Sequence, residues 1–150
     1  MLALLGWILL SFLAAFLGGL AAPGAWYEGI RKPAWNPPNA VFAPVWSVLF
    51  LVMGVAAWLV WSRRGAAPVT IALVLFVLQL VLNVLWSWLF FGFHRMDLAF
   101  YEVLLFWALI LVTLVAFWRV RPLAGALLVP YLLWVTFAAY LNLTLWRLNR

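Results

Sequence analysis

Five long stretches without an interior charge, apart from Glu102, constrain the fold more than any other feature of this chain. They cover about residues 2–22, 43–62, 68–91, 97–118 and 123–146. A helix needs about 20 apolar residues to cross the roughly 30 Å hydrocarbon core of a bilayer. Barrel strands are about 10 residues long and alternate polar with apolar side chains, which these stretches do not. The sequence therefore predicts an all-α fold, with one domain over residues 1–150 formed by five transmembrane helices.

The composition excludes several classes of protein. Hydrophobic residues make up 71% of the chain and charged residues 8%, whereas a soluble domain has about 45–50% and about 25%. A soluble enzyme and a disordered chain are both excluded. With no cysteine and a single histidine, His94, no metal site is expected. The nine basic residues are scattered, which favours contact with lipid headgroups over nucleic-acid binding.

The linkers between the stretches predict the topology. Three of them are short and basic, so consecutive helices should lie antiparallel as neighbours in an up-and-down bundle. The exception is a long loop between helices 1 and 2, from Pro23 to Phe42, which is rich in proline. Loops of this length are usually functional or disordered, and the aromatic residues Trp26, Tyr27 and Trp35 argue against disorder. Basic residues divide almost evenly between the two ends of the bundle, so charge assigns no orientation.

Polar side chains inside the spans are costly and need a partner or a purpose. Gln79, Asn83 and Trp86 are spaced by four and three residues, which places them on one face of a helix. This pattern fits hydrogen bonds that hold the bundle together, worth about 0.6 kcal/mol each on average. It also fits a polar patch in a ligand cavity, and both interpretations stay open here.

The last span carries a second face, formed by Trp134, Ala138 and Asn142 at intervals of four. The small residue between Trp and Asn leaves space that either a neighbouring helix or a flat ligand could fill. Pro130 lacks a backbone donor and should kink this helix.

Glu102 is the one carboxylate inside a span. The favoured interpretation is a structural ion pair, with Arg95 as the nearest candidate, or an interfacial carboxylate. A proton-handling role is the weaker alternative, since no second carboxylate lies inside the spans.

Indoles at Trp46, Trp86 and Trp134 lie inside spans and could line a cavity that stacks on a planar ligand. On composition alone, packing and lipid anchoring are the favoured interpretation of these residues.

Five motifs resemble the translocator protein family, which includes bacterial tryptophan-rich sensory proteins and the peripheral-type benzodiazepine receptor. They follow one another over nearly the whole chain: WYEGIRKPAWNPP at 26–38, FAPVW at 42–46, QLVLNVLW at 79–86, FFG at 90–92, and PYLLW at 130–134 continuing to Asn142 and Trp146-Arg147.

The resemblance implies a five-helix membrane protein, commonly a homodimer, with a cavity beneath the first loop. It implies binding of porphyrins such as protoporphyrin IX and of drug-like ligands of the benzodiazepine site. No cofactor is required, and a porphyrin would be ligand or substrate. The likeness to bacterial members favours the cell membrane or the outer membrane of a bacterium as the location of this chain. The ligand-binding residues that match the family are Trp26, Trp35, Asn36, Trp46, Gln79, Asn83, Trp86, Trp134, Ala138 and Asn142.

Within that set, Trp46 and Trp134 match the tryptophans implicated in light-dependent porphyrin breakdown, which makes them the candidate catalytic residues. Arg31 and Lys32 could meet the carboxylates of a porphyrin at the cavity mouth.

Three departures from the animal pattern weaken other expectations. Leu143 and Thr144 stand where the animal cholesterol motif has its tyrosine, and Tyr140 lies too early for it, which argues against high-affinity cholesterol binding. Asn36 replaces a histidine and Asn39 an arginine, so drug affinities do not transfer.

Three functions remain. The leading one is a membrane protein that senses, sequesters or moves tetrapyrroles. The alternative is an enzyme that degrades protoporphyrin under light. A transporter or channel ranks last because no inverted repeat or row of pore charges is present. Gly18-Gly19 and Gly54-x-x-Ala57 offer surfaces for close approach, either in a dimer or within one bundle.

Overall fold

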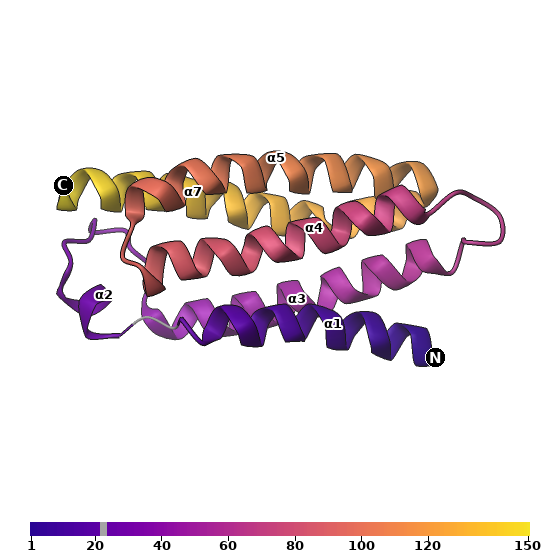
Figure 1. The fold of residues 1–150 in the computed structure, drawn as a ribbon, viewed down its shortest axis with the longest axis horizontal. Helices are drawn as coiled ribbons and strands as arrows, with labels where there is room; N and C mark the ends of the chain where they lie inside the picture. Colours follow the sequence, from indigo (N-terminus) through magenta and orange to yellow (C-terminus); the bar gives the residue numbers. More distant parts are fainter. Residues whose placement is uncertain (22–23) are drawn as a thin grey trace.

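The computed structural model describes residues 1–21 and 24–150, nearly all of them helical (Figure 1). No strand occurs in these two ranges, and five helical stretches are long and apolar enough to cross a membrane. This confirms the predicted all-α membrane bundle. The elements are α1 (Leu2–Gly19), α2 (Ala25–Gly29), α3 (Asn39–Trp61), α4 (Thr70–Ser87), the π-helix η1 (Trp88–Gly92), α5 (Met96–Val120), α6 (Pro122–Leu127) and α7 (Val129–Asn149).

The helix boundaries differ from the predicted spans by a few residues. The second span begins at Asn39 and includes Pro44 inside the helix, where proline lacks the N–H that would bond to the carbonyl four residues earlier. The third span is not one regular α-helix, since it ends in the five-residue π-turn η1. Ala22, the expected end of the first span, and Pro23, the expected start of the loop, lie outside the described residues.

The spans form a closed ring, in the order α1, α3, α6–α7, α5, α4 and back to α1. Most pairs of consecutive spans are neighbours. Helices α3 and α4 make only a small contact, and α1 packs against both of them. The expectation that every short linker joins packed neighbours is therefore wrong for this pair. The eight residues between α3 and α4 reach up to roughly 26 Å when extended, so they leave room for α1 on one side and a cavity on the other.

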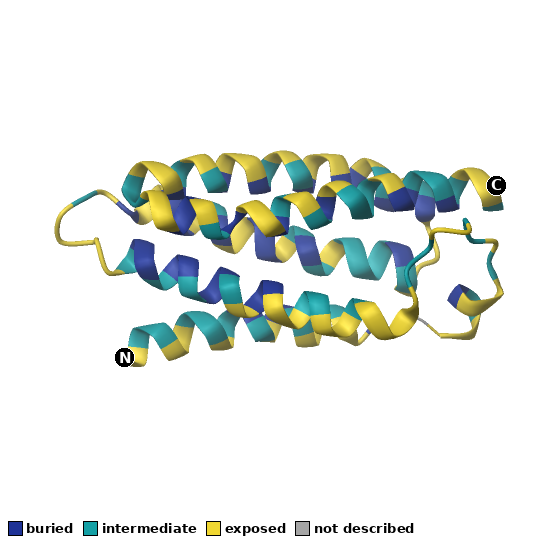
Figure 2. Ribbon diagram, turned by 180° about the vertical axis from the view of Figure 1, so that it is seen from behind, coloured by how far each residue is buried: buried dark blue, intermediate teal, exposed yellow. Residues whose placement is uncertain are grey.

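Apolar residues lie on both the inside and the outside of the bundle, and Figure 2 shows how buried and exposed positions alternate along the helices. Met53, Phe76 and Phe106 are almost completely buried, whereas Ile71, Leu105 and Leu133 are more than 60% exposed. Such an outer surface is not that of a soluble protein, because soluble monomers rarely expose apolar patches of this extent. The outward apolar faces are those of an integral, multi-pass membrane protein.

Glycine brings α1 and α3 into backbone contact. A Cβ on Gly54 would lie 2.7 Å from the Cα of Ile8, and Ala57, one turn later, is fully buried. Gly18 packs on the side chain of Ser87 in α4, and only Gly19 of the four small residues has open space around it. The small residues of Gly54-x-x-Ala57 therefore serve packing within one bundle.

The last span is interrupted as Pro130 predicts. Helix α6 ends at Leu127, Leu128 forms a turn, and α7 starts at Val129 with Pro130 in its first turn. Because proline clashes with the carbonyl four residues earlier, the break falls just before it.

Candidate ligand-binding site

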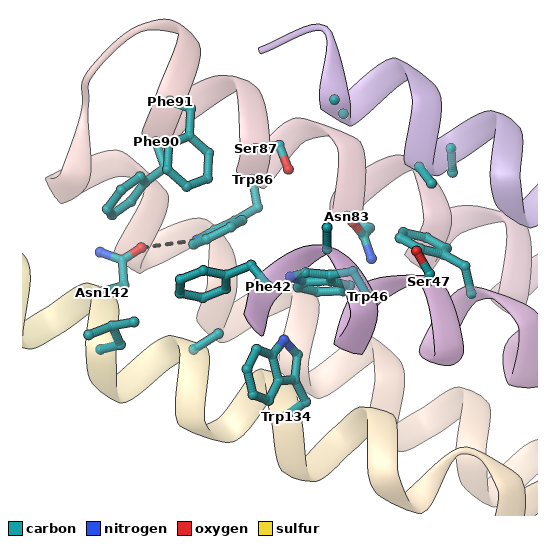
Figure 3. Close-up of a pocket in the computed structure, with 18 of the residues that line it drawn as sticks. Phe42, Trp46, Ser47, Asn83, Trp86, Ser87, Phe90, Phe91, Trp134 and Asn142 are labelled. Carbon is teal, nitrogen blue, oxygen red and sulfur yellow. Dashed lines mark hydrogen bonds between the residues drawn. The ribbon is translucent and has the colours of Figure 1, made fainter. Parts of the chain in front are cut away.

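A cavity of about 410 Å³ lies at the end of the bundle that carries α2 (Figure 3). Its wall is built by α1, α3, α4, η1 and α7, and Tyr27 of α2 closes one side. Small-molecule sites in proteins enclose about 300–1,000 Å³ and are mostly apolar with a few polar groups. The cavity lies where α3 and α4 diverge. Ala15, Gly18 and Gly19 of α1 supply part of its wall.

Two indoles from neighbouring helices meet in the wall. The rings of Trp46 in α3 and Trp134 in α7 are 6.4 Å apart between centroids and nearly perpendicular, at 87°. Phe42 meets the edge of Trp134 at 6.1 Å. The indole nitrogen of Trp134 is buried and has no hydrogen-bond partner among the described residues. Figure 3 shows this nitrogen pointing toward Trp46.

Trp86 is fixed by a hydrogen bond across the bundle. Its indole Nε1 donates to Oδ1 of Asn142 at 3.0 Å, drawn as the dashed line in Figure 3. The Asn142 amide in turn donates to the carbonyl of Met96 at 2.9 Å. Trp86 also stacks on Phe90 of η1 at 5.3 Å. The orientation of the Trp86 ring is therefore set by α7 on one edge and by the π-turn on its face.

The polar face of α4 is divided between the cavity and the core. Asn83 lines the cavity and donates through Nδ2 to the hydroxyl of Tyr131 at 2.9 Å. That hydroxyl donates to Oε1 of Gln79 at 2.6 Å, and Gln79 is 2% exposed and lies away from the cavity. The interpretation of this face as interhelical hydrogen bonding holds for Gln79. Asn83 serves both the hydrogen-bond network and the cavity wall.

Residues 24–37, which we call the lid, cover this end of the bundle. Tyr27 is the lid residue that reaches the cavity. Trp26 stacks on His94 with centroids 4.2 Å apart and planes 8° from parallel. Trp35 stacks on Tyr140 of α7 at 5.5 Å. The lid is thus attached to the bundle on two sides.

The predicted site residues separate into two groups in space. Six line the cavity: Trp46, Asn83, Trp86, Trp134, Ala138 and Asn142. The other six do not. Gln79 is in the core. The other five belong to the lid: Trp26, Arg31, Lys32, Trp35 and Asn36.

The basic pair of the lid has contacts of its own. Arg31 is exposed, and its backbone bonds to the side chain of Asn149. The Lys32 ammonium donates to the carbonyl of Glu28 at 3.2 Å and lies 4.7 Å from the centre of the Tyr27 ring.

Glu102 does not form the expected ion pair with Arg95. Arg95 binds Asp97 through two hydrogen bonds, of 3.0 and 2.9 Å, at the start of α5. Both carboxylate oxygens of Glu102 are buried without a hydrogen-bond partner among the described residues, and the side chain is 9% exposed. The preference of Arg95 for Asp97 follows from proximity, since only one residue separates them.

Several features of the site have weak signals in the sequence. The π-turn η1 widens the end of α4, with Phe93 N–H bonded to the carbonyl of Trp88 five residues earlier. His94 follows it with a φ of 58°, in the left-handed region that non-glycine residues seldom adopt. Single π-turns within helices recur at functional sites, but an uninterrupted apolar run in the sequence does not show where a π-turn will form. The available signal for the part that α1 takes in the wall was the spacing of its small residues, three and four positions after Ala15.

The chemistry of the site is that of a binding cavity. Within residues 1–21 and 24–150, no group of three or more histidine, aspartate or glutamate side chains could hold a metal ion. The wall offers aromatic faces and amides, and the buried N–H of Trp134 has no hydrogen-bond partner among the described residues. These groups suit a flat apolar molecule with a hydrogen-bond acceptor.

Comparison with known proteins identifies relatives along almost the whole chain. The model of the TspO/MBR family matches residues 7–147. "Tryptophan-rich protein TspO" of Chlorobaculum tepidum is 44% identical over 132 residues, which cover 85% of this chain and 82% of that protein. "Protein CrtK" of Rhodobacter capsulatus is 38% identical over 137 residues, covering 91% and 86%. "Translocator protein" of Homo sapiens is 39% identical over 150 residues, covering 97% and 89%.

Proposed function

The chain belongs to the TspO/MBR family of membrane proteins, and on that premise we propose that it binds tetrapyrroles such as protoporphyrin IX in the cavity beneath the lid. Its role is that of a sensory or translocator protein. The observation that carries this proposal is the cavity of about 410 Å³ with Trp46, Trp86 and Trp134 in its wall. Aromatic faces stack on a flat macrocycle, and the N–H of Trp134 has no partner within the described residues.

The lid supplies the charge that a porphyrin needs. Protoporphyrin carries two propionates, and Arg31 and Lys32 lie on the lid that covers the cavity. Hydrogen bonds from a cationic donor to a carboxylate are roughly twice as strong as neutral ones. We therefore assign the macrocycle to the cavity and the propionates to this basic pair at its mouth.

Quenching of tryptophan fluorescence by protoporphyrin IX tests the proposal in the purified protein. Trp46→Phe and Trp134→Phe should weaken binding, because each removes an indole from the wall. Trp118→Phe is the matched control, since Trp118 is 50% exposed on the outside of α5. Equal titrations for all three variants and the parent would reject the cavity as the site.

The same cavity should accept drug-like ligands of the benzodiazepine site, in competition with porphyrin. We expect ligands of this class to compete with porphyrin. Their affinities for the animal proteins do not transfer, because Asn36 and Asn39 differ from the animal residues at these positions. Displacement of bound porphyrin by an isoquinoline carboxamide, followed by absorption spectroscopy, measures it.

A second candidate function is light-dependent degradation of protoporphyrin. The perpendicular contact of Trp46 and Trp134 favours it, because indoles are easily oxidised and these two lie where the macrocycle would bind. This function requires a defined product, formed from porphyrin and dioxygen under light, whose yield collapses in either Phe variant. Bleaching at the rate of free porphyrin in detergent would exclude it.

We also propose that the protein forms homodimers in a bacterial membrane, either the cell membrane or the outer membrane. Gly54 and Ala57 are used within the bundle, so the dimer contact lies elsewhere. Sedimentation in density-matched detergent measures the stoichiometry, and membrane fractionation distinguishes the two locations.

A further inference from the structure

Asn149, in the last turn of α7, holds the lid through a pair of hydrogen bonds. The backbone N–H of Arg31 donates to Oδ1 of Asn149 at 2.7 Å, and Nδ2 of Asn149 donates to the carbonyl of Arg31 at 2.8 Å. The same amide nitrogen donates to the carbonyl of Leu145 at 2.8 Å. The side chain is thus oriented by its own helix while it pairs with both backbone groups of one lid residue.

This pair is distinct from the other contacts of the lid. Among the described residues, no other hydrogen bond joins the lid to a transmembrane helix. The other contacts of the lid include aromatic pairs: Trp35 packs against Tyr140 and Phe137, Trp26 against His94 and Phe90, and the buried Tyr27 against Phe90 and Phe91. Aromatic pairs accept a range of offset and tilted arrangements, whereas two opposed hydrogen bonds fix both position and direction.

The position of Asn149 relates it to the cavity. Its partner Leu145 lines the cavity wall, and Phe137, which meets Trp35, lines it too. The helix that carries Trp134 and Asn142 therefore also holds the lid in place. Arg31 and Lys32 emerge from the lid directly at the point of attachment.

We propose that Asn149 is a positioning residue that latches the lid over the cavity, and that release of the latch limits the passage of ligand. The effect on ligand passage rests on the proposed porphyrin binding, whereas the attachment of the lid by Asn149 does not. Because the latch uses the backbone of residue 31, the Arg31 side chain is free to meet a ligand carboxylate while the lid stays closed.

Hydrogen exchange of the full chain in detergent, without ligand, tests the latch. In Asn149→Ala, amides of residues 25–36 should exchange about thirtyfold faster, since two hydrogen bonds are lost and each corresponds to roughly a factor of five. Leu148→Ala is the control, because its exposed side chain lies next to the latch. Asn149→Asp keeps the acceptor for the Arg31 N–H and loses the donor, so its exchange should be intermediate.

Exchange of residues 137–145 shows whether the effect is confined to the lid. If α7 exchanges as in the parent while the lid exchanges faster, Asn149 acts on the lid. Lid exchange equal in Asn149→Ala and Leu148→Ala would overturn the latch, as would faster exchange throughout α7.

Stopped-flow mixing with protoporphyrin IX tests the effect on ligand passage. Asn149→Ala should raise the association and dissociation rates by similar factors, about five- to tenfold, and change the Kd less. Arg31→Ala keeps the latch, so lid exchange should stay as in the parent, while affinity falls for protoporphyrin IX but not for its dimethyl ester.

The possible failures are distinguishable. A parent protein that binds no porphyrin, yet shows faster lid exchange in Asn149→Ala, rejects the proposed function and keeps the latch. If the lid exchanges faster in Asn149→Ala but the association and dissociation rates of porphyrin are unchanged, the latch does not limit the passage of ligand.

Discussion

Gly54 lies directly against the backbone of Ile8, because a Cβ at position 54 would be 2.7 Å from the Ile8 Cα. We expect Gly54→Ala to destabilise the protein by about 1–3 kcal/mol, the usual cost of overpacking a core, because backbone cannot move aside as a side chain end can. Gly19→Ala is the control, since nothing lies within 4 Å of its added Cβ. Thermal unfolding in detergent measures both, and equal stabilities would contradict the close contact of α1 and α3.

Tyr131→Phe should destabilise the bundle without altering the cavity wall. The lost hydroxyl leaves the amides of Gln79 and Asn83 without their shared partner. Hydrogen bonds between membrane helices contribute about 0.6 kcal/mol on average and at most about 1.7, so we expect a loss of about 1–3 kcal/mol for the two. Tyr140→Phe keeps the ring that stacks on Trp35 and should unfold like the parent. A similar loss in both variants would argue against the Tyr131 network.

Asn142→Leu should weaken porphyrin binding by freeing Trp86. The substitution removes the acceptor of the Trp86 indole N–H and the donor to the Met96 carbonyl. One lost hydrogen bond of about 1 kcal/mol corresponds to a roughly five- to tenfold higher Kd, measured by fluorescence quenching. Thr144→Val serves as control, because the Thr144 hydroxyl bonds to a carbonyl of its own helix. Unchanged affinity in Asn142→Leu would show that the orientation of Trp86 does not matter for the ligand.

Glu102→Gln should leave stability unchanged or raise it. Neither oxygen of Glu102 has a partner among the described residues, so the amide of similar shape loses no contact and removes an ionisable group from an apolar site. Breaking a buried ion pair would instead cost about 3–5 kcal/mol. Chemical unfolding in detergent separates the two cases, and a loss of that size would restore the ion-pair interpretation. Asp97→Asn breaks the exposed pair with Arg95 and should change stability little, because solvent screens an ion pair at the surface.

Much of the bundle was predictable because the bilayer imposes its own length and polarity on each span. Uninterrupted apolar runs marked all five helices, and Pro130 marked the break in the last one. Short linkers predicted the neighbours correctly except for α3 and α4, because the eight residues between these two helices permit contact without enforcing it. The ring order depends instead on which faces fit closely, as Gly54 fits Ile8.

The candidate site shows the same division. Residues at helical spacing, such as Trp134, Ala138 and Asn142, were correctly placed on one face, and all three line the cavity. The partner of Glu102 was predicted wrongly, because sequence distance does not show that Asp97 competes for Arg95. The partner of Arg31 was not predicted at all, since it lies 118 residues away and its bonds use backbone atoms.

Closure of the ring by α7 has a consequence for how the protein is made. As the chain leaves the ribosome and enters the membrane, its first four spans can form only an open arc. The indole of Trp134 and the amide of Asn142 arrive with the fifth span, so the nascent chain has no complete binding chamber until that span inserts. The order of the helices alone therefore makes the last span to enter the membrane the one that completes the cavity.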